Sequence, residues 1–362
     1  MSQRLTLDPP FRIERRPDGG RGFWVQTFAI ATLASLLVTA LLFWIAGADI
    51  FTGFAALIEG AVGSRRNLLE SLTRATPLIL TGLGTVVAYR ARIWNVGQEG
   101  QFFAGAMTAY WATHALAAPS FVILPLAFAA GFAGAAAYAA FAGWLKARLG
   151  VEEVISTVLL NYIILYGLSL LLLNGPWSDA NSYYQRTPTL PQAAWLPLIA
   201  EKSHLHVGFI LAILAAVVVH VLINRTAFGF ELRAFGFNPR VLALKGKGSA
   251  RLLITVMALS GGLSGLAGVG EVYGVHHRLL EGISAGYGYA GIMIAILARL
   301  NPLGVILAAF LFGCLDNAAI TLPVRIGVPA ALSDMIQAVA LIMFVGAAAL
   351  STYRIGRAPR VV

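Results

Sequence analysis

Several long stretches of this chain contain almost no charged residue, and this feature constrains the fold more than any other. Residues 28–45 and 124–145 hold no acidic or basic group, and residues 332–350 hold only Asp334. A helix rises about 1.5 Å per residue, so roughly 20 such residues cross the ~30 Å hydrocarbon core of a bilayer. With 58% hydrophobic and 12% charged residues, the chain has too few polar residues for a water-facing shell. The sequence therefore predicts an all-α integral membrane protein.

The apolar runs, separated by polar, proline or glycine links, predict ten membrane spans. Their approximate limits are 24–46, 75–91, 99–117, 121–145, 153–173, 207–223, 252–273, 283–299, 302–320 and 333–350. The spans near 75–91 and 283–299 are short or rich in glycine, so the sequence leaves open whether they are full or re-entrant. The predicted fold thus has about ten transmembrane helices, with broken or re-entrant helices allowed among them.

The distribution of basic residues predicts the orientation. Most of the 26 Lys and Arg residues lie in the N-terminal tail and in alternate links between spans. Because cytoplasmic links are enriched in Lys and Arg, both termini are predicted to be cytoplasmic, with tails at 1–22 and 351–362 around a transmembrane domain at 23–350. The first apolar run exceeds the 7–15 residues of a signal-peptide core, so we expect an uncleaved first helix. The net charge of +10 is interpreted as a topology signal, and no nucleic-acid partner is expected.

Small residues recur at every fourth position on two of the predicted spans. These residues are Gly131, Ala135, Ala139 and Gly143 on one span, and Gly261 and Gly265 on another. In lipid, such stripes let two helices approach closely enough for van der Waals packing. We prefer packing within one bundle to a dimer face as their role.

A first cluster of polar residues lies between the second and third predicted spans. Its members are Asn95, Gln98, Glu99 and Gln101. Amides and a carboxylate near bilayer depth are costly unless they pair or line a cavity. The cluster is therefore either a turn that shapes a translocation path or a plain loop beside Arg90 and Arg92, and chemistry alone does not separate the two.

Two further segments supply candidate residues for a path. Asn161 and Tyr162 follow hydroxyl residues on an otherwise apolar span, where they could bind a polar solute or, more commonly, a neighbouring helix. Trp177 begins the long link 174–206, whose aromatic and proline residues fit an interfacial gate or docking surface. An ordinary aromatic belt at the headgroup level explains the same composition equally well.

The longest predicted inner loop, 224–251, alternates apolar and charged residues. The pattern predicts a short amphipathic helix, a break at 236–239 and a second short helix. Such a loop suits docking to a cytoplasmic partner, although a helix lying on anionic lipid is slightly favoured by chemistry alone. The candidate docking residues are Glu231, Arg233, Ala234, Gly236 and Asn238.

Signatures of catalysis and nucleotide binding are missing from the sequence. Gly246 and Lys247 are followed by Gly248, and Val241 stands where a phosphate-binding loop needs its first glycine. With one cysteine, Cys314, and no cluster of metal-ligand spacing, we expect no metal and no cofactor. The chain is therefore predicted not to be an enzyme.

Ion coupling is the main alternative to an ATP-driven role. A proton- or sodium-coupled carrier usually needs carboxylates at mid-membrane, whereas Asp316 falls near the outer end of its span. A self-contained ion-coupled secondary transporter or channel nevertheless remains open on residue chemistry.

Four segments together resemble the permease subunits of bacterial ABC importers of the branched-chain amino acid and simple-sugar class, in particular the nucleoside uptake permeases. The segments are 74–84, 94–101, 153–162 with 175–177, and 232–239, reading RATPLILTGLG, WNVGQEGQ, EVISTVLLNY with GPW, and LRAFGFNP. The resemblance extends over about residues 20 to 350.

This resemblance implies a permease that forms the path for nucleosides or related ribose or sugar solutes in the bacterial cytoplasmic (inner) membrane. It implies three kinds of partner, namely cytoplasmic ATPase subunits that use the ATP, a second, non-identical permease chain, and an extracytoplasmic solute-binding lipoprotein. On this interpretation the loop 224–251 is a coupling loop with a coupling helix that inserts into the ATPase. The residues expected along the path are Asn95, Gln98, Glu99, Asn161, Tyr162 and Trp177.

Overall fold

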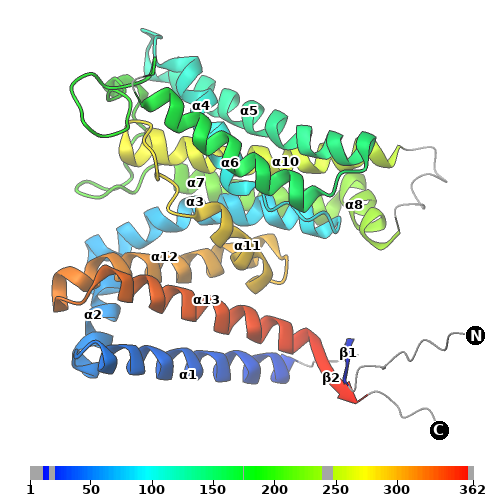
Figure 1. Ribbon diagram of the computed structural model, residues 1–362. Coiled ribbons are helices and arrows are strands. Elements are labelled where there is room, and N and C mark those ends of the chain that lie inside the picture. Colours follow the sequence, from blue (N-terminus) through cyan, green and yellow to red (C-terminus); the bar gives the residue numbers. More distant parts are fainter. Residues whose placement is uncertain (1–10, 16–20, 174, 239–247, 358–362) are drawn as a thin grey trace, which may run out of the picture. The chain divides into compact units, whose positions relative to one another are not determined.

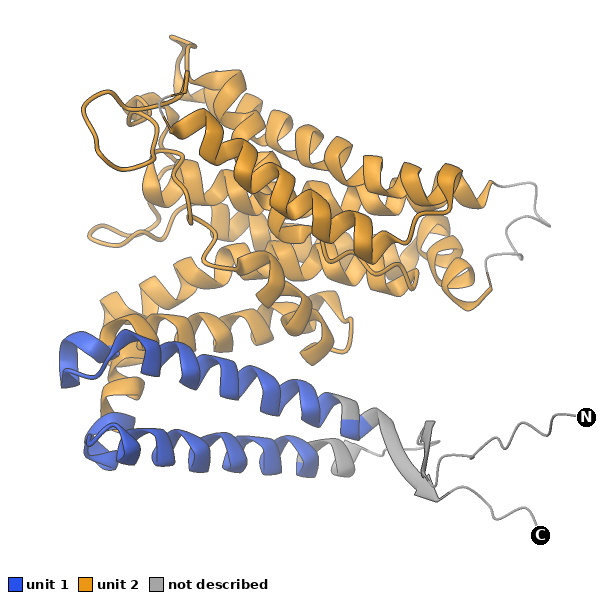
Figure 2. Ribbon diagram, viewed as in Figure 1, with its two compact units in different colours: residues 1–54, 322–362 blue, residues 55–321 orange. Residues whose placement is uncertain are grey.

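The computed structural model describes residues 11–15, 21–173, 175–238 and 248–357. These residues divide into two compact units (Figure 2), which are described separately below. The first unit comprises residues 1–54 and 322–362, and the second comprises residues 55–321.

The first unit is built on two long apolar helices. Helix α1 (Arg21–Ile45) packs along α13 (Ala330–Thr352), and the rings of Phe28 and Phe344 stack with centroids 6.2 Å apart. Strands β1 (Phe11–Arg15) and β2 (Tyr353–Arg357) pair antiparallel next to these helices. The sequence did not predict this small two-stranded sheet.

The second unit holds most of the remaining helices (Figure 1). In chain order they are the end of α2 (Ile50–Val62), α3 (Arg65–Arg90), α4 (Gln98–Thr113), α5 (Ser120–Leu149), α6 (Glu153–Leu172), the 3₁₀ turn η1 (Gln192–Ala194), α7 (Gly208–Arg225), α8 (Ala227–Phe237), α10 (Ser249–Glu271), the π turn η2 (Val272–His276), α11 (Tyr287–Leu297) and most of α12 (Pro302–Ile326).

Helix α10 is the centre of this unit. It packs against α3, α4 and α5. Of the residues in its most apolar stretch, 67% are buried, whereas only 22% are buried in the corresponding stretch of α5. A Cβ added to Gly265 would lie 2.3 Å from the Cβ of Ala135, and one added to Gly261 would lie 2.3 Å from the Cβ of Ala139. The two small-residue stripes therefore face each other, and the predicted packing within one bundle is confirmed.

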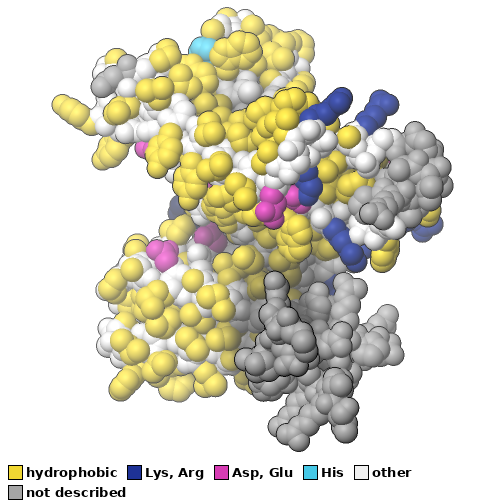
Figure 3. Space-filling view, turned by 45° about the vertical axis from the view of Figure 1, so that its right-hand side comes forward, with side chains coloured by type: hydrophobic (Ala, Val, Ile, Leu, Met, Phe, Trp, Pro, Cys, Tyr) yellow, Lys and Arg dark blue, Asp and Glu magenta, His cyan; other side chains and the backbone are white. Residues whose placement is uncertain are grey.

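A helix occupies each of the ten predicted spans. Seven helices in the described part of the chain are long and apolar enough to cross a membrane, namely α1, α5, α6, α7, α10, α12 and α13. The polytopic membrane fold is thus confirmed, although the orientation and the tails at 1–22 and 351–362 stay predictions. Hydrophobic side chains cover most of the face in Figure 3, and Lys and Arg side chains gather along one edge.

The two spans of uncertain length differ in their outcome. The segment 75–91 belongs to α3, which continues for 26 residues through Pro77. The segment 283–299 does not form a full-length helix. It begins with turns, and the helix that follows, α11, has only 11 residues. At about 1.5 Å per residue, α11 covers roughly half of a bilayer core.

The predicted coupling loop is only partly described. Helix α8 covers Ala227–Phe237, as expected for the first short helix. Thr226 caps its start by accepting a hydrogen bond from the backbone N–H of Gly229 at 3.3 Å. The predicted second helix lies outside the described residues.

Candidate functional site

The polar cluster at the start of α4 is fully enclosed by protein. The Asn95 side chain is 0% exposed; its amide nitrogen donates to Gln101 Oε1 and to Ser260 Oγ, each at 2.9 Å. Its oxygen accepts from the backbone N–H of Gly97 at 3.0 Å and from Gln101 Nε2 at 2.9 Å. Asn95 therefore ties the turn before α4 to α10 and has used its hydrogen-bonding capacity within the protein.

Gln98 connects three helices at the same depth. Its side-chain amide lies between Thr85 on α3 and Ser264 on α10. With the amide nitrogen facing the backbone oxygen of Thr81, at 2.5 Å, and the amide oxygen facing Thr85, all its polar atoms have partners. Buried amides of this kind hold helices together because an unpaired polar group in lipid is costly.

Glu99 lies against the start of the half-length helix α11. Its Oε2 accepts a hydrogen bond from the backbone N–H of Gly288 at 2.8 Å. The first N–H groups of a helix have no partner within the helix, and its N-terminus carries partial positive charge. A carboxylate from α4 therefore caps α11 from outside its own chain segment.

Glycines allow the start of α4 to lie close to α11 on one side and to α6 on another. A Cβ on Gly288 would lie 2.3 Å from the backbone nitrogen of Glu99, and one on Gly100 would lie 2.7 Å from Asn161 Oδ1. Any larger residue at either position would force the backbones apart. Gly288 and Gly100 thus serve close helix contact.

Asn161 on α6 completes the network. Its Oδ1 accepts from the backbone N–H of Gly100 at 2.8 Å, and its nitrogen donates to Val96 O at 3.0 Å and to the hydroxyl of Tyr289 at 3.2 Å. The side chain is 0% exposed. Interhelical bonding, which the sequence favoured for this residue, is what the structure contains.

Three tyrosines lie on the outer side of this network. Tyr162 and Tyr166, one helical turn apart on α6, are 52% and 72% exposed, and their rings stack with centroids 6.4 Å apart. Tyr289 on α11 is 41% exposed, and its hydroxyl accepts a hydrogen bond from Asn161, the residue before Tyr162 on α6. Tyr166 and Tyr289 were not singled out from the sequence, because an aromatic residue in an apolar run resembles any lipid-facing residue.

Trp177 lies apart from the buried amides. Its ring makes an edge contact with Tyr110 of α4, with centroids 5.2 Å apart, at the end of the bundle that carries the link 174–206. That link is held in place by backbone hydrogen bonds from Thr187 to Leu279 O and from Leu196 to Tyr273 O, each 2.8 Å. Trp177 and Tyr162 are therefore not part of one compact cluster.

Helix α8 is docked firmly on the unit. Leu232 is 0% exposed, Arg233 donates to the backbone oxygen of Ile223, and a Cβ on Gly236 would lie 2.7 Å from Arg90 O at the end of α3. Glu231 and Ala234 are half-buried, whereas Asn238 is exposed. Phe237 is 79% exposed and so projects a large apolar ring from the end of the helix.

The acidic group on α12 is paired. Asp316 Oδ2 lies 2.7 Å from Arg74 Nη1, and the two side chains are about equally shielded, with 24% and 26% exposed. Asn317 donates to the backbone oxygens of Gly60 and Asn67, at 2.9 Å each. These two residues tie α12 to α2 and α3.

Comparison with known families and proteins identifies the kind of protein to which this architecture belongs. The family model described as branched-chain amino acid transport system / permease component matches residues 67–345. The chain is 34% identical to the guanosine ABC transporter permease protein NupP of Bacillus subtilis, over 91% of this chain and 94% of that protein. It is 30% identical to the glucose ABC transporter permease protein TsgB13 of Haloferax volcanii, over 98% of this chain and 94% of that protein. A second guanosine ABC transporter permease protein of B. subtilis, NupQ, is 25% identical over 69% of this chain and 80% of that protein.

Proposed function

We propose that this chain, a member of the family of permease components of branched-chain amino acid transport systems, carries nucleosides across the membrane. The proposed transporter is an ATP-driven importer. The chain is the permease component of an ABC transporter. The observation that supports a nucleoside as the solute is the 34% identity to a guanosine permease over nearly the whole of both chains. Because a glucose permease is related at 30%, a sugar is the competing solute.

We assign the contact with solute to the exposed tyrosines of α6 and α11. Tyr162, Tyr166 and Tyr289 offer aromatic faces and hydroxyls on the surface of the unit. Stacking of a base on an aromatic ring contributes about 1–3 kcal/mol, which suits a purine ring. The amides of Asn95, Gln98 and Asn161 would then position this face from behind, with Glu99 holding α11 and Trp177 lying nearer the end of the path.

Helix α8 is our candidate for the contact with the ATPase subunits. Its buried side contacts α3 through Gly236 and α7 through Arg233, so a displacement of α8 would act on both helices. Its outer side presents Glu231, Phe237 and Asn238. ATP would be consumed by these partner subunits, and this chain would need no cofactor of its own.

The ATPase contact can be tested by co-purification. Phe237→Ala and Glu231→Lys should each reduce the amount of ATPase recovered with the permease several-fold, while insertion into the membrane is unchanged. Tyr183→Ala provides the control, because Tyr183 is fully exposed on the opposite link. Normal recovery of the ATPase with both α8 variants would rule out α8 as the contact.

Two other partners belong to the proposal. The match to both NupP and NupQ, two guanosine permeases of one bacterium, supports a second, non-identical permease chain beside this one. The link 175–206, with Tyr183 and Tyr184 exposed, suits docking of an extracytoplasmic solute-binding lipoprotein. The proposal assigns the chain to the bacterial cytoplasmic membrane with both termini in the cytoplasm, as the distribution of its Lys and Arg residues predicts.

Uptake by intact cells tests the solute. Cells lacking this chain should take up radiolabelled guanosine several-fold more slowly than the parent, and glucose at the parental rate. Loss of glucose uptake with normal guanosine uptake would contradict a nucleoside as the solute and indicate a sugar instead.

A further inference from the structure

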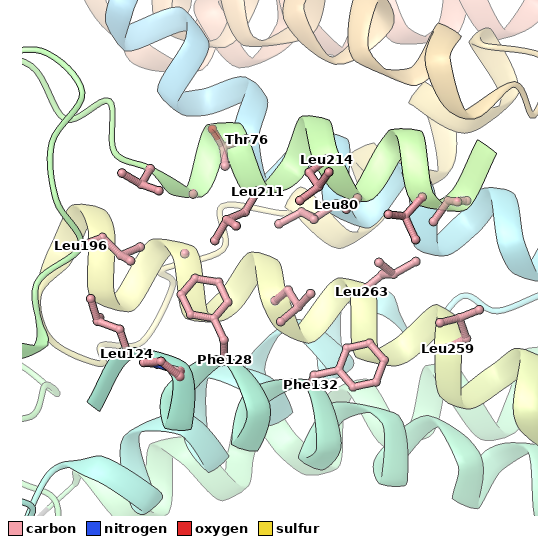
Figure 4. A pocket seen from close by; sticks show the side chains of 18 of the residues that line it. Thr76, Leu80, Leu124, Phe128, Phe132, Leu196, Leu211, Leu214, Leu259 and Leu263 are labelled. Carbon is pink, nitrogen blue, oxygen red and sulfur yellow. The ribbon is translucent and has the colours of Figure 1, made fainter. Parts of the chain in front are cut away.

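Helix α7 leaves a cavity of about 730 Å³ between itself and its neighbours α5 and α10 (Figure 4). Helix α7 packs against α3 and leads into α8. Leu211 and Leu214 of α7 face Phe128 of α5 and Leu263 of α10 across the cavity (Figure 4). Thr76 and Leu80 of α3 complete the lining, so the cavity is an elongated groove between the four helices α3, α5, α7 and α10.

The walls of this groove are almost entirely hydrocarbon. Of its lining residues, all within the described part of the chain, only Thr76 has a polar side-chain atom. The Thr76 hydroxyl already donates to the backbone oxygen of Leu72 at 3.1 Å. A water molecule needs two to four polar partners to be held in a cavity, and here it would find none. The groove thus suits an apolar occupant.

The groove is continuous with the lipid-facing surface of the bundle. Leu214 and Val218 line it and are also 55% and 56% exposed, so it opens sideways between helices that span the membrane. The exposed residues beside its mouth on α7, Ile210 and Val217, are aliphatic as well. A chain entering from the bilayer would meet no polar group on the way.

The dimensions of the groove match one hydrocarbon chain. Along α7 its lining runs from Gly208 to Leu222, which at 1.5 Å per residue is about 21 Å. The groove is therefore longer than one leaflet of the ~30 Å hydrocarbon core, so it can hold an extended acyl chain along its length. Dispersion contacts with leucine and phenylalanine side chains on four helices would hold the chain in place.

We propose that this groove binds one acyl chain of a bilayer phospholipid and so braces α7 against α10. No charged side chain lines the groove, so binding depends on the hydrocarbon chain and not on the headgroup. The bound chain fills space that protein side chains leave open between α7 and the centre of the unit.

Cross-linking of the unmodified protein tests this proposal directly. The full chain is placed in vesicles of phosphatidylethanolamine and phosphatidylglycerol that contain a phosphatidylcholine with a photoreactive diazirine near the end of one acyl chain. After illumination, labelled residues are mapped by mass spectrometry. Label on Phe128 and Leu263, inside the groove, is expected. Label confined to outward residues such as Ile210 and Val217 would overturn the proposal.

A pair of variants gives an independent test. Ala215 lines the groove and Val217 does not, although both lie on α7. Native mass spectrometry of protein released from nanodiscs should find one strongly retained phospholipid per chain in the wild type and in Val217→Trp, and none in Ala215→Trp. Equal retention in Ala215→Trp and Val217→Trp, or none in the wild type, would contradict the proposal.

Discussion

Glu99 of α4 accepts a hydrogen bond from the backbone N–H of Gly288 at 2.8 Å, and so one buried carboxylate holds the start of the half-length helix α11. Helix α11 begins within the protein, where its first N–H groups cannot reach water. This contact explains how a helix too short to cross the bilayer can start inside the bundle.

The first prediction concerns this cap. Glu99→Leu removes the acceptor and should lower the free energy of unfolding by about 1–3 kcal/mol, because buried N–H groups lose their partner. Glu99→Gln keeps an oxygen acceptor and should cost less. Thermal unfolding in detergent measures both. Glu152→Leu, at an exposed position one residue before α6, is the control, and equal loss in Glu99→Leu and Glu99→Gln would contradict the capping role.

The close contact of α5 and α10 gives a second prediction. A Cβ at Gly265 would lie 2.3 Å from the Cβ of Ala135 and 2.7 Å from the backbone oxygen of Gly131. Gly265→Ala should therefore destabilise the protein by roughly 1–3 kcal/mol through overpacking. Gly167→Ala, in the middle of α6 with open space around it, should be neutral or stabilising by up to about 1 kcal/mol. Similar melting temperatures for the two variants would refute the close packing.

The sequence predicts the features of this fold that depend on local patterns, and it does not predict those that depend on contacts between distant residues. The ten helices follow from uninterrupted apolar runs, and the contact of α5 with α10 follows from the four-residue spacing of Gly131 and Ala135 against Gly261 and Gly265. The sequence left open whether 283–299 is a full or a re-entrant span, and it could not give the half-length of α11, because the cap of that helix comes from Glu99, far away in sequence. Strands β1 and β2 are also too distant in sequence and too short to predict.

The candidate site was predictable to a similar degree. The sequence identified Asn95 and Gln98 as costly polar groups and Asn161 as a group that bonds a solute or a neighbouring helix, and all three are buried. It could not identify their partners Ser260 and Ser264, since those contacts depend on which helices become neighbours. Burial alone separates these amides from exposed Tyr162, and burial is a property of the assembled bundle.

A pH dependence of stability is the third prediction. His206, outside the membrane spans, is buried, and burial lowers its pKa to about 4, with His277 and His204 adding to the effect. Between pH 6.5 and 4 the unfolded chain therefore binds more protons at this site than the folded chain. Stability contributed by neutral His206 is complete above pH 6.5 and is lost as the pH falls toward 4.

Lowering the pH from 7 to 5 should thus cost about 2 kcal/mol at this site. His206→Gln should remove most of the dependence, as measured by melting temperature at the two pH values. His114→Gln, at an exposed histidine, should keep it. An unchanged slope in His206→Gln would show that other groups cause the dependence.

The fourth prediction separates the exposed tyrosines from ordinary lipid-facing residues. Tyr162→Ala should raise the KM for guanosine uptake roughly 10-fold, because stacking of a base contributes about 1–3 kcal/mol. Tyr162→Phe should keep most of the affinity. Ile163→Ala, at a neighbouring residue that is 62% exposed, serves as the control. Equal KM values in Tyr162→Ala and Ile163→Ala would place the solute elsewhere.

Transport by purified components in sealed vesicles tests the central claim most directly. The chain is reconstituted with its second permease and its ATPase subunits, and accumulation of radiolabelled guanosine is measured in the presence of the solute-binding protein. We predict accumulation that requires ATP on the ATPase side and the complete complex, and that continues when proton and sodium gradients are dissipated. Accumulation by this chain alone, driven by an ion gradient without ATP, would contradict the account.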